Sequence, residues 1–488
     1  MDSMSSNEKL KIVNKNLDRL MLIAENNVKK GKYECALAAL SAYCNIQYNI
    51  NQVYTDEKAE NLVLDIGKRL VKTPKNYKRE NNTVLFYDGF GLDLRGWGAS
   101  FAKALTESDY DLIYVVPSSS KGKIPHIEME VKKGLGKLVF IEMNHSYVKW
   151  IYELSNVFKT YQPKASFFYT TPFDVSGAAV FDAYKGNLLR IQVDLTDHAF
   201  WIGVNAFDYA IHSRLPSASN MIYGRGVPLE KIKRMDCCPY INREMDSTPL
   251  PFDIEHERYV FSGGSLYKTL GDQDLYYYRI VDHILKEHKK IKFLFAGEGD
   301  DSELKKIIEK YPGRAFHIHE RSDFIRLFEN CIFLLNTYPM FGGLMMRYAA
   351  MVGKVPLTLK HGNDHEGLLN DQDKRGIEFD TYEDVIVEAD KLIEDEVYRK
   401  QKEYDLVGSV MTEEEFTRNV KLLIEEQRTE YSFDKVKEID TREFRAEYVK
   451  RLDPNEMLAK VIPNRKNKVL FSYFPILFLR KLKRRIIK

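Results

Sequence analysis

The sequence has few cysteines, and their arrangement excludes two classes of protein. Only five occur among 488 residues, at Cys35, Cys44, Cys237, Cys238 and Cys331. An odd number at scattered spacings matches neither a disulfide framework nor the paired Cys and His ligands of a structural zinc site. Sparse cysteine of this kind is typical of proteins that work in a reducing compartment.

Long apolar runs are also missing. The longest apolar-rich stretch, 469–479, contains Ser472 and Pro475 and is far shorter than the ~20 residues that a membrane-spanning helix needs. The first residues, MDSMSSNEKLKIV, lack the basic segment and apolar core of a secretory leader. We therefore expect a cytoplasmic protein without a spanning helix.

The chain has almost no net charge, but its charge is unevenly placed. Its 73 Lys and Arg against 71 Asp and Glu give a net charge of +2, which argues against a nucleic-acid-binding protein. Residues 465–488 carry nine bases and no acid, so the remaining chain has 64 bases against 71 acids, a net −7. The sequence thus combines an acidic body with a basic tail.

The basic tail, RKNKVLFSYFPILFLRKLKRRIIK, has an apolar and aromatic centre between two basic clusters. This pattern predicts an interfacial helix on an anionic membrane, with the protein held peripherally at the inner face of the cell membrane. The alternative is a terminal helix packed on the body, and Pro475 would interrupt a long helix. Loss of membrane recovery on deletion of 465–488 would support the first interpretation.

The periodicity of apolar residues divides the whole chain, the tail included, into four parts. Residues 1–80 have helical spacing, and KGKYECALAALSAYC matches half of a tetratricopeptide unit only once, which favours a helical cap over a solenoid. Apolar strands alternate with helices over 81–247 and again over 255–430, after a proline-containing linker, and 431–488 holds the C-terminal helices and tail. We predict an α/β protein with two doubly wound Rossmann-like domains facing a cleft and an N-terminal helical extension.

Two motifs follow strands of the first predicted domain. Gly89, Gly91 and Gly96 belong to a glycine-rich turn that also carries Arg95, a cation able to bind a phosphate. The alternative there is an ordinary tight βα turn. The pair Asp197-His198 ends a later strand and is placed for proton transfer or hydroxyl binding, although a lone His is more often structural. Trp201 is either a core residue or a stacking platform.

Three further motifs follow strands of the second predicted domain. Gly263 and Gly264 form a turn with Lys268 within reach of a phosphate, or else a plain turn with a surface lysine. Gly297 and Glu298 belong to a turn whose glycines are compatible with close approach of a nucleotide. A plain βα turn with Asp300 or Asp301 as the helix N-cap is the better explanation of its acidic residues. The most persuasive motif opens a helix whose free N–H groups and dipole suit a diphosphate; it begins at Gly342 and Gly343.

Metal binding is not expected. His317 and His319 alternate along a short strand, but no third ligand lies at a useful spacing. The sequence also has no DxD signature in a suitable position. We expect no metal site and no cofactor.

The motifs together resemble a glycosyltransferase of the GT-B architecture, and most closely the retaining family-4 glycosyltransferases. The resemblance covers 84–428, and its best stretch is FDYAIHSRLPSASNMIYGRGVPLEKIKRMDCCPYIN, followed in order by FSGG, FAGEG and the double-glycine helix. It implies a nucleotide-sugar donor on the second domain and an acceptor on the first. It also implies that His198 touches the transferred sugar, that Lys268 binds the diphosphate, and that Gly343 and Leu344 bind the distal phosphate.

The sequence departs from the family at its paired glutamates, where Met340 and Tyr348 stand. Arg347 is adjacent to Tyr348, and we expect it to contact a phosphate. Glu366 is the candidate to replace the glutamate that binds the ribose in the family. The resemblance implies retention of configuration, and Arg95, Lys268 and the Gly343 helix end would balance the diphosphate charge without a metal.

The leading hypothesis is a glycosyltransferase that acts on a glycan, lipid-linked or protein acceptor, in bacterial surface polysaccharide or glycoconjugate synthesis. Asp197, His198 and Arg95 are its predicted catalytic residues. The alternatives are a nucleotide-sugar epimerase of the same architecture and a non-catalytic membrane-docked partner. Donor, acceptor and oligomeric state are left open by the sequence.

Overall fold

The computed structural model describes residues 4–78, 81–134, 136–236, 238–361 and 367–486, with side chains up to Lys483. The chain divides into two compact units. Unit 1 is built from Met1–Met235 and Glu413–Lys488, and unit 2 is the intervening segment Asp236–Thr412. Cys237 and Glu366, both named above, lie outside the described residues.

Unit 1 contains a seven-stranded sheet in the order β3-β2-β1-β4-β5-β6-β7, and each neighbouring pair of strands is parallel. The strand order reverses between β1 and β4, and this is the switch point of the doubly wound sheet, where ligands bind beyond the carboxyl ends of the strands. The strands are β1 (Thr83–Asp88), β2 (Asp111–Pro117), β3 (Lys137–Ile141), β4 (Ala165–Tyr169), β5 (Leu189–Val193), β6 (Tyr209–His212) and β7 (Ile232–Arg234).

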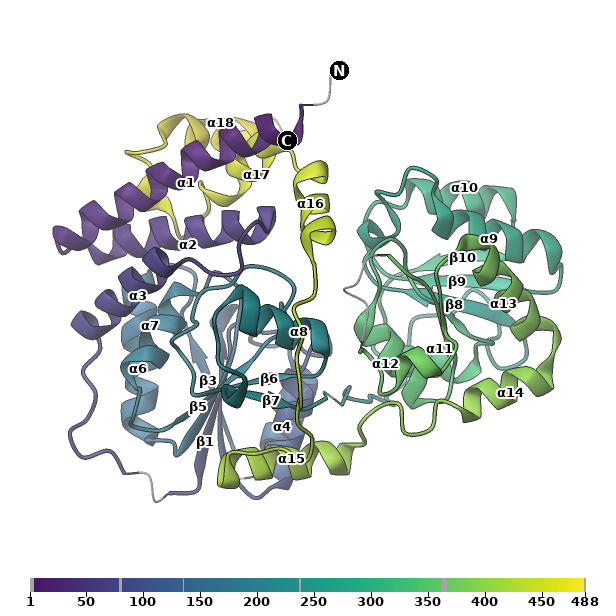
Figure 1. Cartoon of the computed structure of the whole chain (residues 1–488), viewed down its shortest axis with the longest axis horizontal. Helices are drawn as coiled ribbons and strands as arrows, with labels where there is room; N and C mark the ends of the chain where they lie inside the picture. Colours follow the sequence, from purple (N-terminus) through teal and green to yellow (C-terminus); the bar gives the residue numbers. More distant parts are fainter. Residues whose placement is uncertain (1–3, 79–80, 135, 237, 362–366, 487–488) are drawn as a thin grey trace. The chain divides into compact units, whose positions relative to one another are not determined.

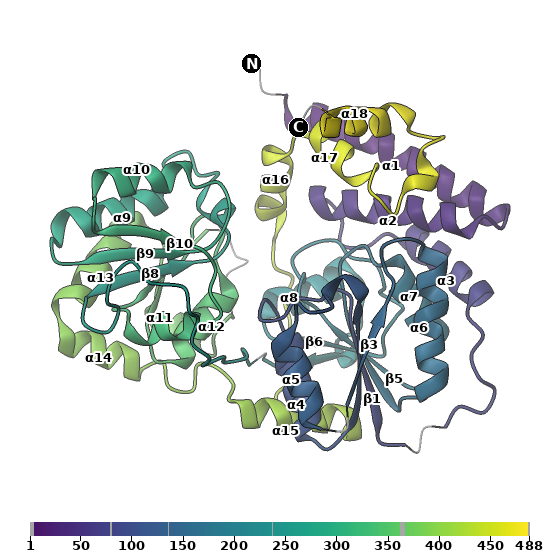
Figure 2. The same ribbon diagram turned by 180° about the vertical axis from the view of Figure 1, so that it is seen from behind.

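Helices cover both faces of this sheet, as continuous apolar strands require. On one face Tyr87 packs against Phe181, with 5.8 Å between ring centroids, and on the other Phe86 packs against Phe101 at 5.3 Å. The first face carries α6 (Tyr147–Tyr161) and α7 (Val175–Ala183), and the second carries α4 (Gly98–Glu107) and α5 (Pro125–Lys133). Figure 2 shows α6 and α7 on the side of the sheet opposite to α4 and α5.

Helices from both ends of the chain pack together on unit 1 (Figure 1). The N-terminal helices are α1 (Ser6–Lys29), α2 (Tyr33–Ile50) and α3 (Glu57–Leu70), and the C-terminal helices are α16 (Arg442–Arg451), α17 (Pro454–Val461) and α18 (Pro475–Ile486). Leu40 of α2, Leu458 of α17 and Phe168 of the sheet belong to one buried cluster. The N-terminal segment is therefore a helical cap on the α/β unit.

Unit 2 repeats the strand order of unit 1, as β10-β9-β8-β11-β12-β13. Its strands are β8 (Tyr259–Gly263), β9 (Lys292–Ala296), β10 (Ala315–Ile318), β11 (Leu334–Leu335), β12 (Pro356–Leu359) and β13 (Glu378–Phe379). The buried clusters place α9 (Tyr276–Glu287), α10 (Ser302–Lys310) and α13 (Tyr382–Glu394) on one face, and α11 (Phe324–Asn330) and much of α12 (Gly343–Met351) on the other. Helix α14 (Glu396–Tyr404) follows α13.

The unit boundaries differ from those expected from the sequence. Unit 2 ends at Thr412 instead of 430, because α15 (Glu413–Glu426) returns to unit 1 and packs Phe416 against Phe101, with 5.0 Å between the rings. Residues 431–488 are part of unit 1 for the same reason, since their apolar side chains enter its core. The segment from Asp236 belongs to unit 2, where the Tyr348 hydroxyl donates to the Tyr240 carbonyl at 3.0 Å.

Among the helices that the structure describes, none combines the length and apolar character needed to span a membrane. Pro475 does not interrupt the terminal helix. It is the first residue of α18, a position where the missing N–H costs nothing and the fixed φ angle suits a helix.

Candidate functional site

The glycine-rich turn of unit 1 is fixed at the carboxyl end of β1 by Asp88. One carboxylate oxygen accepts from the N–H groups of Phe90 and Gly91, both at 2.9 Å, and the other accepts from the Tyr114 hydroxyl at 2.8 Å. Burial raises the pKa of Asp88 to about 6, and these hydrogen bonds oppose the rise. The turn is therefore held rigidly over the edge of the sheet.

The glycines of this turn are closely packed against protein atoms. A Cβ on Gly89 would lie 1.8 Å from Thr170 Oγ1, and one on Gly91, whose φ is +62°, would lie 2.0 Å from Ser120 Oγ. A Cβ on Gly96 would lie 2.2 Å from the Tyr169 hydroxyl oxygen. Packing against these side chains thus favours glycine at the three positions without any ligand. Arg95 is exposed on the same turn, and ligand binding by the turn stays a prediction.

Asp197 and His198 follow β5 at the same edge. The Asp197 carboxylate accepts from Nε and Nη2 of Arg214 at 2.8 and 2.9 Å, and His198 Nδ1 lies 3.4 Å from Asp197 Oδ1. Burial alone would raise the pKa of Asp197, but the Arg214 guanidinium and His198 hold it well below its usual range. Asp197 is therefore ionised and oriented by two partners, of which the sequence indicated only His198.

The loop that carries His198 is tied down from distant parts of the chain. Asn51, at the end of α2, donates from Nδ2 to the His198 carbonyl at 3.0 Å, and Asn220 donates to the Asp197 carbonyl at 3.3 Å. The ring of Phe444 in α16 meets the His198 ring edge-on at 6.0 Å. Helices from both termini therefore position this loop.

The structure decides between the two interpretations of Trp201. The side chain is buried, and the Arg225 guanidinium lies 4.5 Å from its ring centroid and 5.0 Å from that of Tyr54. This arrangement places Trp201 in the core next to the His198 loop. The loop after Trp201 is held by Glu60 of α3, which accepts from the N–H groups of Gly203 and Val204 at 2.8 and 3.2 Å.

In unit 2 the loops after β8 and β11 meet beside the switch point of the sheet. The Met340 N–H donates to the Lys268 carbonyl at 3.2 Å, and Lys268 Nζ donates to the Phe341 carbonyl at 3.3 Å. Desolvation by burial lowers the pKa of Lys268. Lys268 and the double glycine at Gly342 and Gly343, which are far apart in the sequence, therefore lie together.

The N-terminus of α12 opens at this place. Asn336 Oδ1 accepts from the N–H groups of Gly342 and Thr337 at 2.8 and 2.9 Å, which fixes the loop before the helix. Among the described residues, no side chain caps the helix at Gly342. Gly264, with φ of +123°, has no atom within 4 Å of the position of a Cβ, so the backbone there is open to close approach. These features suit a phosphate group.

Gly297 and Glu298 lie beside this loop but have other partners. A Cβ on Gly297 would lie 1.8 Å from the Gly264 carbonyl oxygen. The Glu298 carboxylate is exposed and pairs with His319 Nδ1 at 2.7 Å, while His317 Nε2 lies 2.8 Å from the Gly297 carbonyl oxygen. Gly297 thus has a packing role, and donor binding by either residue stays a prediction.

Arg347 points toward Asp236, the first residue of unit 2. Its guanidinium is buried, and Nη2 lies 3.9 Å from Asp236 Oδ1. Leu344 is half-buried against the cluster that contains Tyr348. The backbone of the first helical turn is therefore better placed for a phosphate than the Arg347 side chain is.

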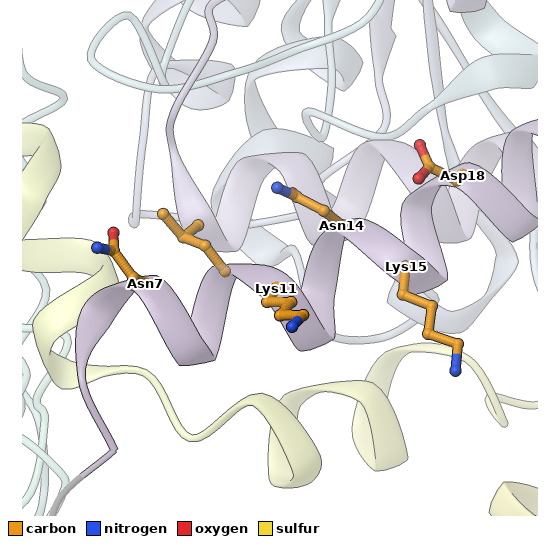
Figure 3. A pocket seen from close by; sticks show the side chains of 6 residues that line it. Asn7, Lys11, Asn14, Lys15 and Asp18 are labelled. Atoms are coloured by element: carbon orange, nitrogen blue, oxygen red, sulfur yellow. The ribbon is translucent and has the colours of Figure 1, made fainter.

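The pocket shown in Figure 3 lies elsewhere, along α1. It is lined by Asn7, Leu10, Lys11, Asn14, Lys15 and Asp18. None of the residues singled out from the sequence lines it. Within the described part of the chain, no group of three or more His, Cys, Asp or Glu side chains is arranged to hold a metal ion.

Comparison with known proteins shows which solved structures have a similar fold. No model of a protein family matches the chain, and no curated protein matches it. It is similar in structure to a mutant O-GlcNAc transferase of Thermobaculum terrenum (14% identity, TM-score 0.50, 84% of this chain and 80% of that chain). It is similar to a UDP-N-acetylglucosamine 2-epimerase (11%, 0.52, 73% and 100%) and to a glycosyltransferase of Rickettsia africae (12%, 0.50, 71% and 98%).

At these identities the likeness shows the fold alone. The two Rossmann-like domains expected from the sequence are confirmed, and the structures to which the chain is similar share this GT-B architecture. Membership of family 4 and retention of configuration stay predictions.

Proposed function

We propose that the chain is a glycosyltransferase that moves a sugar from a nucleotide-sugar donor to a glycan, lipid-linked or protein acceptor, in bacterial surface polysaccharide or glycoconjugate synthesis. The observation that carries the proposal is the meeting of Lys268, Gly264 and the open N-terminus of α12 beside the switch point of unit 2. A half-buried cation, free backbone donors and a helix dipole form a site for a diphosphate. The fold supports this, because it is shared with named glycosyltransferases.

In this enzyme the donor diphosphate would accept hydrogen bonds from Lys268 and from the N–H groups of Gly343 and Leu344. The glycosidic bond to the diphosphate breaks as the bond to an acceptor oxygen forms, and these donors stabilise the negative charge that develops on the leaving group. The charge balance requires no metal. We therefore expect activity in EDTA.

Unit 1 would contribute Asp197, His198 and Arg95. Asp197 is held ionised by Arg214 and orients the His198 ring, so the ring can bind a sugar hydroxyl or accept a proton. The exposed Arg95 adds positive charge at the same edge. Retention of configuration is proposed from the family-4 resemblance.

The first test is nucleotide binding to the full chain, measured as thermal shift and by calorimetry with UDP, GDP, ADP and their sugar conjugates. We expect one nucleotide class to stabilise the wild type. Lys268→Met should weaken its binding about ten-fold or more, because a charge-assisted hydrogen bond is lost. Lys305→Met is the matched control, since Lys305 is an exposed lysine of α10. Unchanged binding by Lys268→Met would contradict the proposed site.

A second candidate is a nucleotide-sugar epimerase, favoured by the likeness to the full length of an epimerase at a TM-score of 0.52. A labelled donor separates the two activities. Label transferred to a cell-envelope extract supports the transferase, and an epimerised nucleotide sugar formed without extract supports the epimerase. The non-catalytic alternative gains support if no nucleotide binds and both His198→Ala and Lys268→Ala preserve cellular function.

A further inference from the structure

The C-terminal segment is firmly attached to unit 1. Arg19 of α1 donates from Nη2 to the Tyr473 carbonyl at 2.5 Å and stacks over the Phe474 ring at 4.6 Å. Phe474 is buried, and Leu477 and Phe478 pack against the same core. Phe474 and two apolar side chains of α18, Leu477 and Phe478, therefore hold the helix on the body.

Five other apolar side chains of this segment are exposed. Ile476, Leu479 and Leu482 recur every third residue along α18 and are 64%, 55% and 56% exposed. Val469 and Phe471, in the preceding turn, are also exposed, and the Phe471 ring packs edge-on against Phe478 at 5.7 Å. Five of the 19 large exposed apolar side chains among the described residues thus fall within 14 residues.

We propose that these five residues, here called the α18 face, dock the protein on the surface of an anionic lipid bilayer. Arg465, Lys468, Arg480 and Lys483 are exposed around the face, and the sequence has no acidic residue from 465 to 488. A bilayer supplies both parts of the matching surface, acyl chains for the apolar side chains and anionic headgroups for the bases.

Charge argues against a second copy of the chain as the occupant. In a symmetric dimer the same surface meets itself, so the bases around one α18 face would oppose those around the other. Like charges that are brought together in this way disfavour association. The apolar side chains alone would permit a dimer, and the surrounding charge selects the anionic membrane.

The packing of α18 on unit 1 determines what its variants should change. Because Leu477 and Phe478 stay packed against the core of unit 1, docking through the α18 face does not require the helix to leave the body. Variants of the outward side chains are therefore expected to change membrane binding without changing the fold. The docking proposal does not depend on the proposed enzymatic function.

The experiment is co-sedimentation of the full chain with vesicles of phosphatidylcholine alone or with 30% phosphatidylglycerol. We expect the wild type to bind the anionic vesicles at least ten-fold more tightly than neutral ones, and binding to weaken with salt. The variant L479E/L482E should lose at least ten-fold in binding at an unchanged Tm. The variant R480E/K483E should do the same through charge.

The matched control is V397E/V407E, which adds the same two negative charges at two exposed apolar positions of unit 2. It should bind vesicles like the wild type. Phe471→Trp gives an independent readout, since a blue shift of its emission on anionic vesicles reports entry into the bilayer surface. Absence of vesicle binding by the wild type, or full binding by L479E/L482E, would overturn the proposal. A wild-type dimer in sedimentation velocity that L479E/L482E dissociates, without vesicle binding, would assign the face to a second copy.

Discussion

At the scale of single residues, the loop that carries His198 is held by two carboxylates, Asp197 and Glu60, whose pKa values are shifted in opposite directions. Asp197 is kept ionised by the Arg214 guanidinium, whereas the buried Glu60 carboxylate accepts from the backbone N–H groups of Gly203 and Val204. Burial therefore dominates at Glu60 and raises its pKa to about 7. The loop is held by one permanently charged acid and by one that titrates near neutrality.

The raised pKa of Glu60 predicts a pH-dependent stability. Between the ordinary glutamate pKa of about 4.5, which applies to the unfolded chain, and the folded value of about 7, the folded state binds the proton more tightly than the unfolded state does. Stability from this group is therefore present in acid and is lost as pH rises to 7, by about 3 kcal/mol at most. Glu60→Gln should flatten this dependence and raise the Tm at pH 7.5.

Scanning fluorimetry from pH 5 to 8 tests this prediction. Glu57→Gln, which changes an exposed acid in the same helix, is the control and should leave the slope as in the wild type. An unchanged slope in Glu60→Gln would show that Glu60 does not titrate in this range.

The sequence located Asp197 and His198 but not the residues that hold them. A strand followed by Asp-His is a local pattern, and the parallel-sheet rule puts it at a ligand-binding edge. Arg214 follows the next strand, β6, and reaches Asp197 only because β5 and β6 are neighbours. Asn51 and Phe444 come from the two helical ends. Partners of this kind depend on tertiary packing, for which a single sequence carries no local signal.

At the scale of elements, two turns of unit 2 depend on each other: the turn at Gly264, after β8, and the turn at Gly297, after β9. Gly297, after β9, leaves no room for a side chain because the Gly264 carbonyl oxygen occupies that space. That oxygen belongs to the backbone of the loop that leads to Lys268, so it cannot move aside as the end of a flexible side chain would. The turn after β9 therefore packs against the loop that forms part of the candidate phosphate site and helps to fix its position.

Gly297→Ala is expected to destabilise unit 2 by about 3 kcal/mol, because the new methyl group would overlap this carbonyl. Gly313→Ala is the matched control, since Gly313 has a φ of +73° but no atom within 4 Å of a Cβ, and it should cost about 1 kcal/mol. Urea unfolding followed by circular dichroism measures both. Equal losses in the two variants would contradict the proposed contact.

The elements themselves were largely predictable. Runs such as 84–90 and 292–299 combine consecutive apolar residues with a glycine near the end, and they overlap β1 and β9. Gly343 was correctly placed at the start of a helix. The direction of Arg347 was not predictable, since α12 is buried over most of its surface and only the fold brings Asp236 near. Local patterns define elements, while the direction of a buried charge depends on its neighbours.

At the scale of the whole molecule, unit 1 requires both ends of the described chain. Leu458, Ile462 and Leu470 are buried in the same cluster as residues of α1, α2 and the sheet, and α15 covers α4 through Phe416. Each fully buried large apolar side chain contributes about 2 kcal/mol or more, so loss of the C-terminal helices would remove a large share of a domain's 5–15 kcal/mol.

Truncation after Thr412 should therefore unfold unit 1 while unit 2 keeps its contiguous core. The three tryptophans, Trp97, Trp150 and Trp201, all lie in unit 1, so their emission reports that unit alone. We expect red-shifted emission in the truncated chain, together with a remaining cooperative transition in circular dichroism. The full chain with L479E/L482E is the control and should keep native emission. Native emission after truncation would contradict the shared core.

The division of unit 1 into two segments has a consequence during synthesis. Unit 2, made of the single segment Asp236–Thr412, can fold as it leaves the ribosome, but the first 235 residues must wait for α15–α18. At about 5–20 residues per second, translation of the inserted segment alone takes roughly 9–35 s. For that time the apolar surfaces of α1, α2 and α4 lack their final cover, so the nascent chain is expected to need chaperone protection until its last helices emerge.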